Sequence, residues 1–170
     1  MSDIITKTLT SEVTIFSTQA NLSEDEKNLC NKAREAMKTS YSPYSNFRVG
    51  AAVLLEDGSI IQGSNQENAA YGPTNCAERS ALFTIGSMGK QTQIRKIAVI
   101  ARPAGATETP VPLEQEVSGS PCGICRQVMK EYESLGGRKW VILMIQNSDR
   151  VFRIEGIDVL LPFAFGPNSL

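Results

Sequence analysis

Three cysteines and one glutamate have the residue types and spacing that could support metal chemistry. Cys122 and Cys125 form a C-x-x-C pair in "PCGIC", and Cys76 stands two places before Glu78 in "CAERSA", in a chain with four cysteines and no histidine. The C-x-x-C spacing is typical both of redox-active thiol pairs and of half a zinc site. Two cysteines three positions apart at the start of a helix point to one side, which suits either chemistry.

The position of Cys76 in the sequence favours a zinc site over a redox-active thiol pair. In the middle of a helix, residues two apart point about 200° away from each other, so Cys76 and Glu78 could not face a common site. They can converge if Cys76 lies at a helix N-terminus, and Gly72 and Pro73 just before it indicate a chain break. Two helix N-termini would then supply three thiolates and leave the fourth tetrahedral position of zinc to water. Glu78 beside that water could act as a general acid and base.

Helices that alternate with apolar strands must position these residues. A capping box at Ser23 and Glu26 predicts a helix over 22–38, and an Asp-Gly turn predicts a β-hairpin over 47–64. Further helices are expected over 76–85 and 120–135, and further strands over 94–101, 140–145 and 150–154, with a short strand also compatible with 11–19.

This order predicts an α/β fold, a three-layer α/β/α sandwich with a mixed, roughly five-stranded sheet. Ser120 is expected to cap the last helix, with Pro121 at its first position. Residues 23–170 are expected to form a single domain, and 1–22 an N-terminal extension that could add an edge strand. The connection 102–120, rich in Pro, Gly and acidic residues, is predicted to be a long loop bordering the pocket.

The composition is that of an ordinary globular protein, with 41% hydrophobic and 21% charged residues. A net charge of −1 provides no polycationic surface, which argues against a nucleic-acid partner. Apolar runs fall short of the ~20 residues that cross a bilayer, and the first residues lack the pattern of a secretory signal, so no membrane association is expected. We therefore expect a cytoplasmic, reducing location, where cysteines more often bind metal or react than form disulfides.

The motifs together resemble the small zinc-dependent cytidine deaminases, in their all-cysteine form. "CAE" followed by "PCGIC" is similar to the zinc deaminase signature, in which the glutamate is not a metal ligand. The resemblance implies hydrolytic deamination of cytidine and deoxycytidine to uridine and deoxyuridine, with release of ammonia, in pyrimidine salvage. It extends over four segments in the family's order, 41–54, 65–82, 120–128 and 160–167.

The resemblance assigns roles around the metal. It implies one Zn²⁺ per chain bound by Cys76, Cys122 and Cys125, with Glu78 as the catalytic proton carrier. Three thiolates on Zn²⁺ leave a net charge of −1, which weakens the acidification of bound water. Arg79 matches the position whose guanidinium donates to sulfur and offsets that charge.

The resemblance also implies a nucleoside pocket. Asn65 and Glu67 would bind the ribose hydroxyls, Phe47 would pack against the base, and the backbone around Ala77 would hold the carbonyl edge of the base. Gln66 departs from the family, since many relatives have an aliphatic residue there.

Assembly is implied by the resemblance as well. The family is largely homotetrameric, with each pocket completed by neighbouring subunits, and Tyr71 and Phe165 match positions that reach across such interfaces.

Four alternatives remain open at this level. A deaminase of the same fold could act on another aminopyrimidine nucleoside such as blasticidin S, and a nucleic-acid-editing deaminase would need a basic channel. A non-catalytic zinc module would bind zinc without an open coordination position. A thiol oxidoreductase would use Cys122 and Cys125 without metal.

Cys30, on the apolar stripe of the first helix, is expected to be a small core residue.

Overall fold

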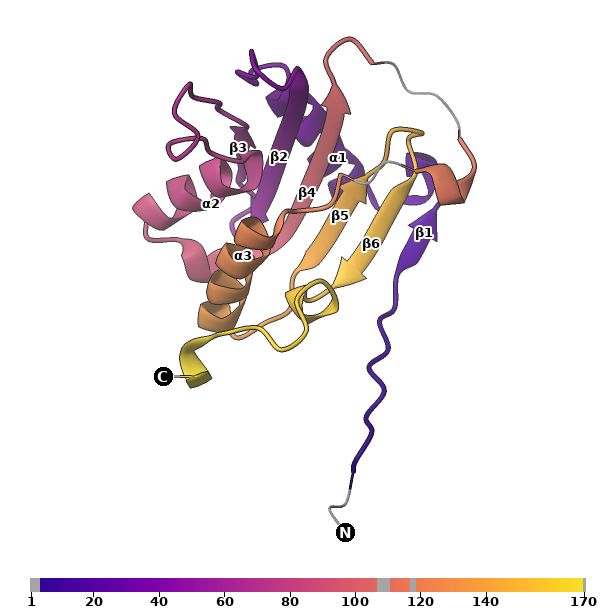
Figure 1. Cartoon of the computed structure of the whole chain (residues 1–170), viewed down its shortest axis with the longest axis vertical. Helices are drawn as coiled ribbons and strands as arrows, with labels where there is room; N and C mark the ends of the chain where they lie inside the picture. Colours follow the sequence, from indigo (N-terminus) through magenta and orange to yellow (C-terminus); the bar gives the residue numbers. More distant parts are fainter. Residues whose placement is uncertain (1–3, 107–110, 117–118, 170) are drawn as a thin grey trace.

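A single six-stranded sheet organises the chain, in the order β1-β6-β5-β4-β2-β3 (Figure 1). The computed structural model describes residues 4–106, 111–116 and 119–169. β4 and β5 run parallel, and the other neighbouring pairs are antiparallel. The strands are β1 (Thr14–Phe16), β2 (Phe47–Leu55), β3 (Ile60–Ser64), β4 (Ile94–Pro103), β5 (Val141–Ile145) and β6 (Val151–Glu155).

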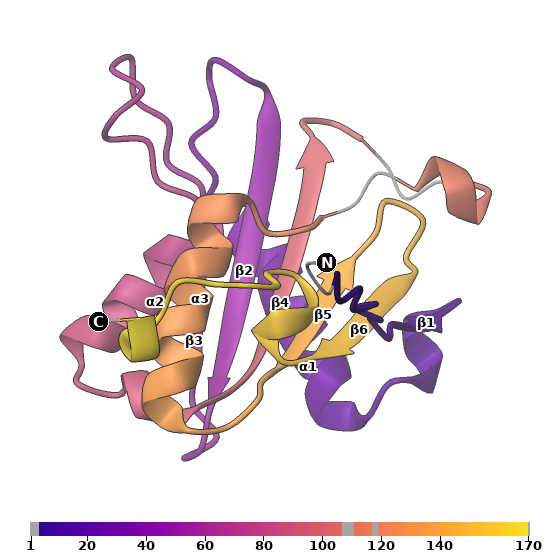
Figure 2. The same ribbon diagram turned by 60° about the horizontal axis from the view of Figure 1, so that its bottom comes forward.

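Helices cover both faces of this sheet, which confirms the three-layer α/β/α sandwich (Figures 1 and 2). Successive side chains of β2 alternate between the two cores, with Val53 in the core under α2 and α3 and Leu54 in the core under α1. The sheet has six strands instead of about five because β1 joins it beside β6. The helices are α1 (Glu24–Met37), α2 (Ala77–Ser87) and α3 (Gly123–Gly136).

Local sequence signals account for several of these elements. Ser23 and Glu26 form the predicted capping box before α1. Gly58 adopts a φ of 81° in the turn between β2 and β3, a conformation that glycine adopts without steric cost. Cys30 is fully buried against the sheet, as expected of a core residue. Among the described residues, no helix has the length and hydrophobicity of a membrane span.

The predicted start of α3 was wrong by two residues. The helix begins at Gly123 with Cys122 as its N-cap, whose backbone is still extended at φ −68° and ψ 166°. Ser120 lies two residues before the cap, and its hydroxyl accepts a hydrogen bond from Arg126 Nη2 at 3.0 Å. Arg126 Nε also donates to the Pro121 carbonyl at 2.7 Å, which holds the preceding turn in place.

Part of the long connection after β4 is anchored on the turn between β5 and β6. Arg150 Nη1 donates to Glu116 Oε1 and to the Val111 carbonyl, each at 2.6 Å, and Ser148 also bonds to Glu116. That the loop borders the pocket stays a prediction. Residues 107–110 and 117–118 of the predicted loop lie outside the described residues.

A glycine brings α2 unusually close to the sheet. A Cβ atom at Gly63 of β3 would lie 2.3 Å from the Ala77 carbonyl oxygen and 2.6 Å from the Ala81 nitrogen. Contacts this short are forbidden, so a residue other than glycine would push away the first turn of α2. Because Cys76 and Glu78 lie at that turn, Gly63 helps to set their position.

We predict that Gly63→Ala lowers the free energy of unfolding by about 1–3 kcal/mol, the usual cost of inserting a methyl group into a close-packed contact. Urea denaturation monitored by circular dichroism measures this change. Gly72→Ala is the matched control, because a Cβ at Gly72 would meet nothing within 4 Å. Equal denaturation midpoints for the two variants would contradict the proposed contact.

Candidate active site

Three cysteine sulfurs converge at the starts of α2 and α3. Cys76 Sγ lies 3.8 Å from Cys122 Sγ, and Cys122 Sγ lies 3.5 Å from Cys125 Sγ. All three sulfurs lie within 4.8 Å of one another, and this is the one group of three potential metal donors in the described part of the chain. Tetrahedral zinc with Zn–S bonds of about 2.3 Å needs sulfurs ~3.8 Å apart. The donor set therefore fits zinc, and the predicted convergence of the three cysteines is confirmed.

Helix N-termini create the electrostatic setting for these sulfurs. Cys76 is the N-cap of α2, with an extended backbone at φ −77° and ψ 156°, as the sequence predicted. Cys122 is the N-cap of α3, and Cys125 lies in its first turn. The free N–H groups and the positive end of each helix dipole favour thiolate over thiol at such positions.

The sulfur cluster is open on one side. Cys125 is fully buried, Cys76 is half-buried and Cys122 is exposed. A metal ion held by the three sulfurs would therefore be accessible to water from the Cys122 side. Three donors with solvent access are typical of a catalytic zinc site, whereas structural zinc sites have four protein ligands.

The thiols of Cys76 and Cys125 differ in how readily they lose a proton. The Cys125 thiol donates a hydrogen bond that lowers the pKa of Cys76 to about 5, and hydrogen bonds from Arg79 and Cys122 act in the same direction. The same interaction with Cys76, together with burial, raises the pKa of Cys125. Cys76 is therefore the sulfur that carries negative charge most readily.

Arg79 stabilises that negative charge. Its Nη2 donates to Cys76 Sγ at 3.5 Å and to the Thr74 carbonyl at 3.4 Å. The hydrogen bond to Cys76 raises the pKa of Arg79, so the guanidinium stays cationic. Its buried Nε has no hydrogen-bond partner among the described residues. A cation here offsets the charge of a three-thiolate site, as the resemblance implied.

Glu78 is a buried carboxyl group next to the cluster. Only 3% of the residue is exposed. Burial raises the pKa of Glu78 to about 7, and the negative charge of Cys76 adds to the effect. A carboxyl group that exchanges its proton near neutral pH has the property required of a general acid and base.

Asn65 holds the segment after β3 against β2. Its Oδ1 accepts hydrogen bonds from the Val49 nitrogen at 2.8 Å and from Ser40 Oγ at 2.5 Å. Its Nδ2 donates to the Phe47 carbonyl at 2.9 Å. The buried amide thus fixes the backbone of Phe47, a half-buried residue, relative to the segment that carries Glu67.

Glu67 is only partly buried and is held by an adjacent turn. It accepts hydrogen bonds from the Tyr44 nitrogen at 2.9 Å, the Ser45 nitrogen at 3.2 Å and the Ser45 hydroxyl. The Ser45 hydroxyl is the main reason why the pKa of Glu67 lies below its usual value. Sequence reasoning missed the role of Ser45, because a serine in a polar turn gives no local signal of it.

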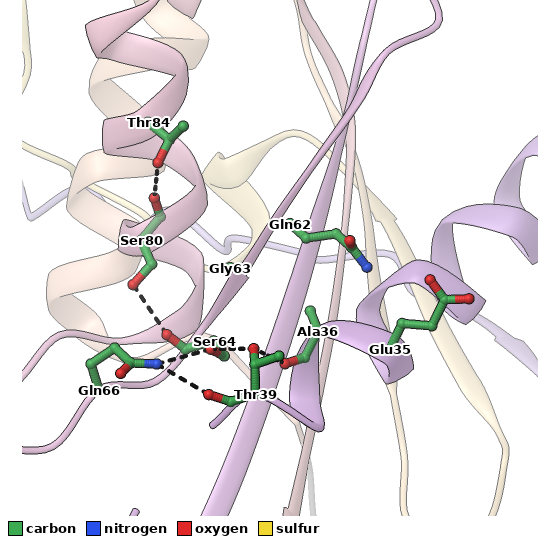
Figure 3. A pocket seen from close by; sticks show the side chains of 9 residues that line it. All are labelled: Glu35, Ala36, Thr39, Gln62, Gly63, Ser64, Gln66, Ser80 and Thr84. Atoms are coloured by element: carbon green, nitrogen blue, oxygen red, sulfur yellow. Dashed lines mark hydrogen bonds between the residues drawn. The ribbon is translucent and has the colours of Figure 1, made fainter. Parts of the chain in front are cut away.

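Gln66 contacts a different set of residues from its two neighbours. Its Nε2 donates to Ser64 Oγ at 3.0 Å and to the Thr39 carbonyl at 3.4 Å, at the wall of a hollow of about 320 Å³ between α1, β3 and α2 (Figure 3). None of the three cysteines lines this hollow. Ser80 connects its wall to the sulfur site, with Oγ donating to the carbonyls of Ser64 and Cys76. The departure at Gln66 thus leaves the contacts of Asn65 and Glu67 intact.

The remaining predicted site residues differ in exposure. Ala77 is fully buried at the first position of α2. Tyr71 is 86% exposed and Phe165 is 58% exposed on the single chain. Arg126, which sequence reasoning did not select, links the turn before α3 to the C-terminal tail by donating to the Leu160 carbonyl at 2.8 Å.

Comparison with known proteins identifies the family. The model of the cytidine and deoxycytidylate deaminase zinc-binding region matches residues 23–144. The chain belongs to this deaminase family. Because the matched region is zinc-binding and contains all three converging cysteines, the cofactor of this deaminase is zinc, one ion in the three-cysteine cluster.

Several cytidine deaminases are similar to this chain over most of its length. The cytidine deaminase of Sporosarcina psychrophila is 45% identical over 148 residues, 86% of this chain and 95% of the relative. That of Halalkalibacterium halodurans is 50% identical over 107 residues, 63% of this chain and 71% of the relative. The crystal structure of cytidine deaminase from Burkholderia pseudomallei has a TM-score of 0.63 and 38% identity, covering 81% of this chain and 97% of that one. The predicted fold class and family resemblance are thereby confirmed.

We predict that the purified chain contains one zinc ion and that Cys125→Ala loses at least nine-tenths of it, because two sulfurs cannot hold the metal tightly. Mass spectrometry of the metal content, with the protein concentration measured on the same sample, gives the ratio. Cys30→Ala is the control, since Cys30 is an equally buried cysteine in the opposite core. Loss of zinc in the control as well would show that general destabilisation, and not the donor set, determines the metal content.

Proposed function

We propose that this chain is a cytidine deaminase that hydrolyses cytidine and deoxycytidine to uridine and deoxyuridine with release of ammonia. The observation that carries the proposal is the buried Glu78 carboxyl group beside three converging sulfurs, in a chain of the deaminase family. The names of its relatives, cytidine deaminases at 45–50% identity, support the substrate class.

The site residues would have distinct roles in the hydrolysis. Zinc bound by the three cysteines would supply the Lewis acidity that lets water lose a proton near neutral pH. Glu78 would accept that proton, deliver it to the ring nitrogen and then transfer a proton to the departing amino group. The oxygen of water would first add to C4, giving a tetrahedral adduct protonated at the ring nitrogen. The C4 hydroxyl would then lose its proton through Glu78 to the amino group and become the carbonyl as the bond from C4 to the amino nitrogen breaks, so one water is consumed for each ammonia released.

Nucleoside recognition would depend on the segment after β3. Glu67 is partly exposed and held in place by Ser45, so its carboxylate could accept hydrogen bonds from ribose hydroxyls. Asn65 would hold the backbone of this segment in place through its hydrogen bonds to Val49 and Phe47. Phe47 would pack against the base. The backbone at Ala77, beside the sulfur of Cys76, would hold the carbonyl edge of the base.

We also propose a homotetramer, with residues 23–170 as one catalytic domain and 1–22 as an extension. The exposure of Tyr71 and Phe165 supports the proposal, because aromatic side chains at interfaces are exposed in the isolated subunit. Cytoplasmic pyrimidine salvage is the proposed setting. The free thiols of the cluster need a reducing compartment to stay reduced until they bind metal.

Replacement of Glu78 by glutamine tests the mechanism. We predict that Glu78→Gln keeps its zinc and its fold but loses about 10²–10⁴-fold in kcat, the usual contribution of a positioned proton carrier. The fall of ultraviolet absorbance as cytidine is consumed measures turnover, and the metal content is determined on the same sample. Glu131→Gln, on the exposed face of α3, is the control and should retain full activity.

Several results would reject the proposal. Near-normal turnover by Glu78→Gln would require another general base, and a zinc-loaded wild-type chain without turnover of any aminopyrimidine nucleoside would be a non-catalytic zinc module. Turnover of blasticidin S with none of cytidine or deoxycytidine would place the chain among deaminases of another aminopyrimidine nucleoside. A zinc-free protein that reduces disulfides through Cys122 and Cys125 would revive the oxidoreductase alternative.

Replacement of Glu67 tests substrate binding separately from chemistry. We predict that Glu67→Ala raises the KM for cytidine about tenfold or more, because the ribose loses a hydrogen bond to a charged carboxylate. Steady-state kinetics with cytidine measure this. Ser45→Ala removes the main hydroxyl contact of Glu67 but keeps the carboxylate, so its KM should change less. Equal effects in both variants would indicate that Glu67 only orders the turn.

A further inference from the structure

An extended segment at the N-terminus, residues 5–13, has no counterpart in the family match. We call it the N-terminal arm. The arm precedes residues 23–144, which the family model matches. The match to the Burkholderia pseudomallei structure includes 97% of that chain but only 81% of this one. Figure 1 shows the arm as an extended trace that leads from the N-terminus up to β1. Its role is therefore separate from the family's shared chemistry.

The sequence of the arm is compatible with an extended strand that has one partly apolar face. Apolar residues recur at every fourth position, so Ile5, Leu9 and Val13 lie on one face of an extended chain, interrupted by the polar Lys7 and Ser11. The other face is polar: Thr6, Thr8, Thr10 and Glu12. Threonine and the β-branched aliphatic residues favour extended backbone. Such a strand normally pairs along its edges and covers its apolar face.

In the single chain the arm lacks this pairing. No backbone hydrogen bond of residues 5–13 is found among the described residues. Ile5 is 89% exposed, Leu9 is 52% exposed and Val13 is 43% exposed. Strand pairing begins only at Thr14, where the three-residue β1 joins β6.

Pairing with β6 is unfavourable for most of the arm. Thr14 pairs with Arg153, so a longer β1 would place Val13 opposite Ile154 and Glu12 opposite Glu155. Two carboxylates directly opposite each other across a strand pair repel and destabilise it. β6 also ends at Glu155, and the chain then turns at Gly156 with a φ of 84°. β6 therefore offers no partner to residues 5–11.

The arm is complementary to itself. If two arms pair antiparallel about Leu9, Leu9 lies opposite Leu9 and Ile5 lies opposite Val13, so the apolar residues match across the pair. Lys7 then lies opposite Ser11, and Glu12 opposite Thr6, so no like charges face each other. We propose that residues 5–13 form an exchange arm that pairs antiparallel with the same residues of a second copy of this chain, about a two-fold axis at Leu9.

The body provides a surface for the apolar face of the paired arms. Leu9 borders a hollow of about 340 Å³ that is also lined by Val159, Pro162 and Phe163. Phe163 is 92% exposed and adopts a φ of 56°, which is strained for an aromatic residue. In the proposed register, Ile5 of the partner subunit would lie opposite Val13. The paired arms would then cover the apolar surface around Phe163, which is exposed to solvent in the single chain. β1 is the outermost strand of the sheet, so no other strand of the described chain pairs with its outer edge.

Single cysteines test the register directly. Leu9→Cys places two thiols opposite each other, about 5 Å apart between Cβ atoms, and should give covalent dimers in most chains under mild oxidation. Lys7→Cys alone places its two copies four residues out of register, about 13 Å apart, and should give none above the wild-type background. The double variant Lys7→Cys with Ser11→Cys restores an opposite pair and should cross-link. Wild-type chain, loaded with zinc, controls for the native cysteines.

Charge substitution tests the same surface without oxidation. Leu9→Lys puts two ammonium groups at the axis and should raise the concentration needed for assembly at least tenfold, as measured by analytical ultracentrifugation over a dilution series. Thr8→Lys, on the polar face of the arm, should leave this concentration unchanged. Cross-linking that is equal at positions 7 and 9, or an unchanged assembly concentration for Leu9→Lys, would overturn the proposal. Either result would indicate random collision or a different partner for the arm. The test depends on neither zinc nor deaminase activity.

Discussion

The site depends on one constraint of the sheet, that β3 and β4 point the same way. Both strands pair antiparallel with β2, so the chain leaves them at the same edge. α2 follows β3 and α3 follows β4, and both helices pack on the same face (Figure 2). Their N-termini therefore meet above one edge, where the N-cap sulfurs and Cys125 of the first turn of α3 come together. Ligand sites in α/β folds commonly form beyond the carboxyl ends of strands, for the same reason.

A second group of contacts fixes this meeting point. Gly63 lets the first turn of α2 lie directly on β3, and Ser80 ties that turn to the Ser64 carbonyl. Arg126 holds the turn before α3 by its contacts with Pro121 and Leu160. These residues touch none of the sulfurs through their side chains, yet the sulfur separations follow from them. A metal site needs such support because its ligands must hold their geometry before the ion binds.

Electrostatics at the site combine opposing effects. Two helix N-termini and the Arg79 guanidinium favour negative sulfur, while burial beside Cys76 disfavours the charged form of Glu78. The same small region thus stabilises thiolates and keeps a carboxyl group able to hold a proton near neutral pH. The two pKa values move in opposite directions because Cys76 accepts hydrogen bonds from Cys125 and Arg79, whereas Glu78 is buried beside the negative charge of Cys76.

The sequence alone determined the residue types, the elements and the chemistry they suit. The capping box, the Asp-Gly hairpin and the N-terminal placement of Cys76 depend on interactions within a few residues, and local signals predict such features well. Only the tertiary structure decided that Cys122, and not Ser120, caps α3, that Ser45 holds Glu67, and that Gly63 seats α2. Each of these depends on groups that are far apart in the chain or on a backbone approach that a single position does not reveal.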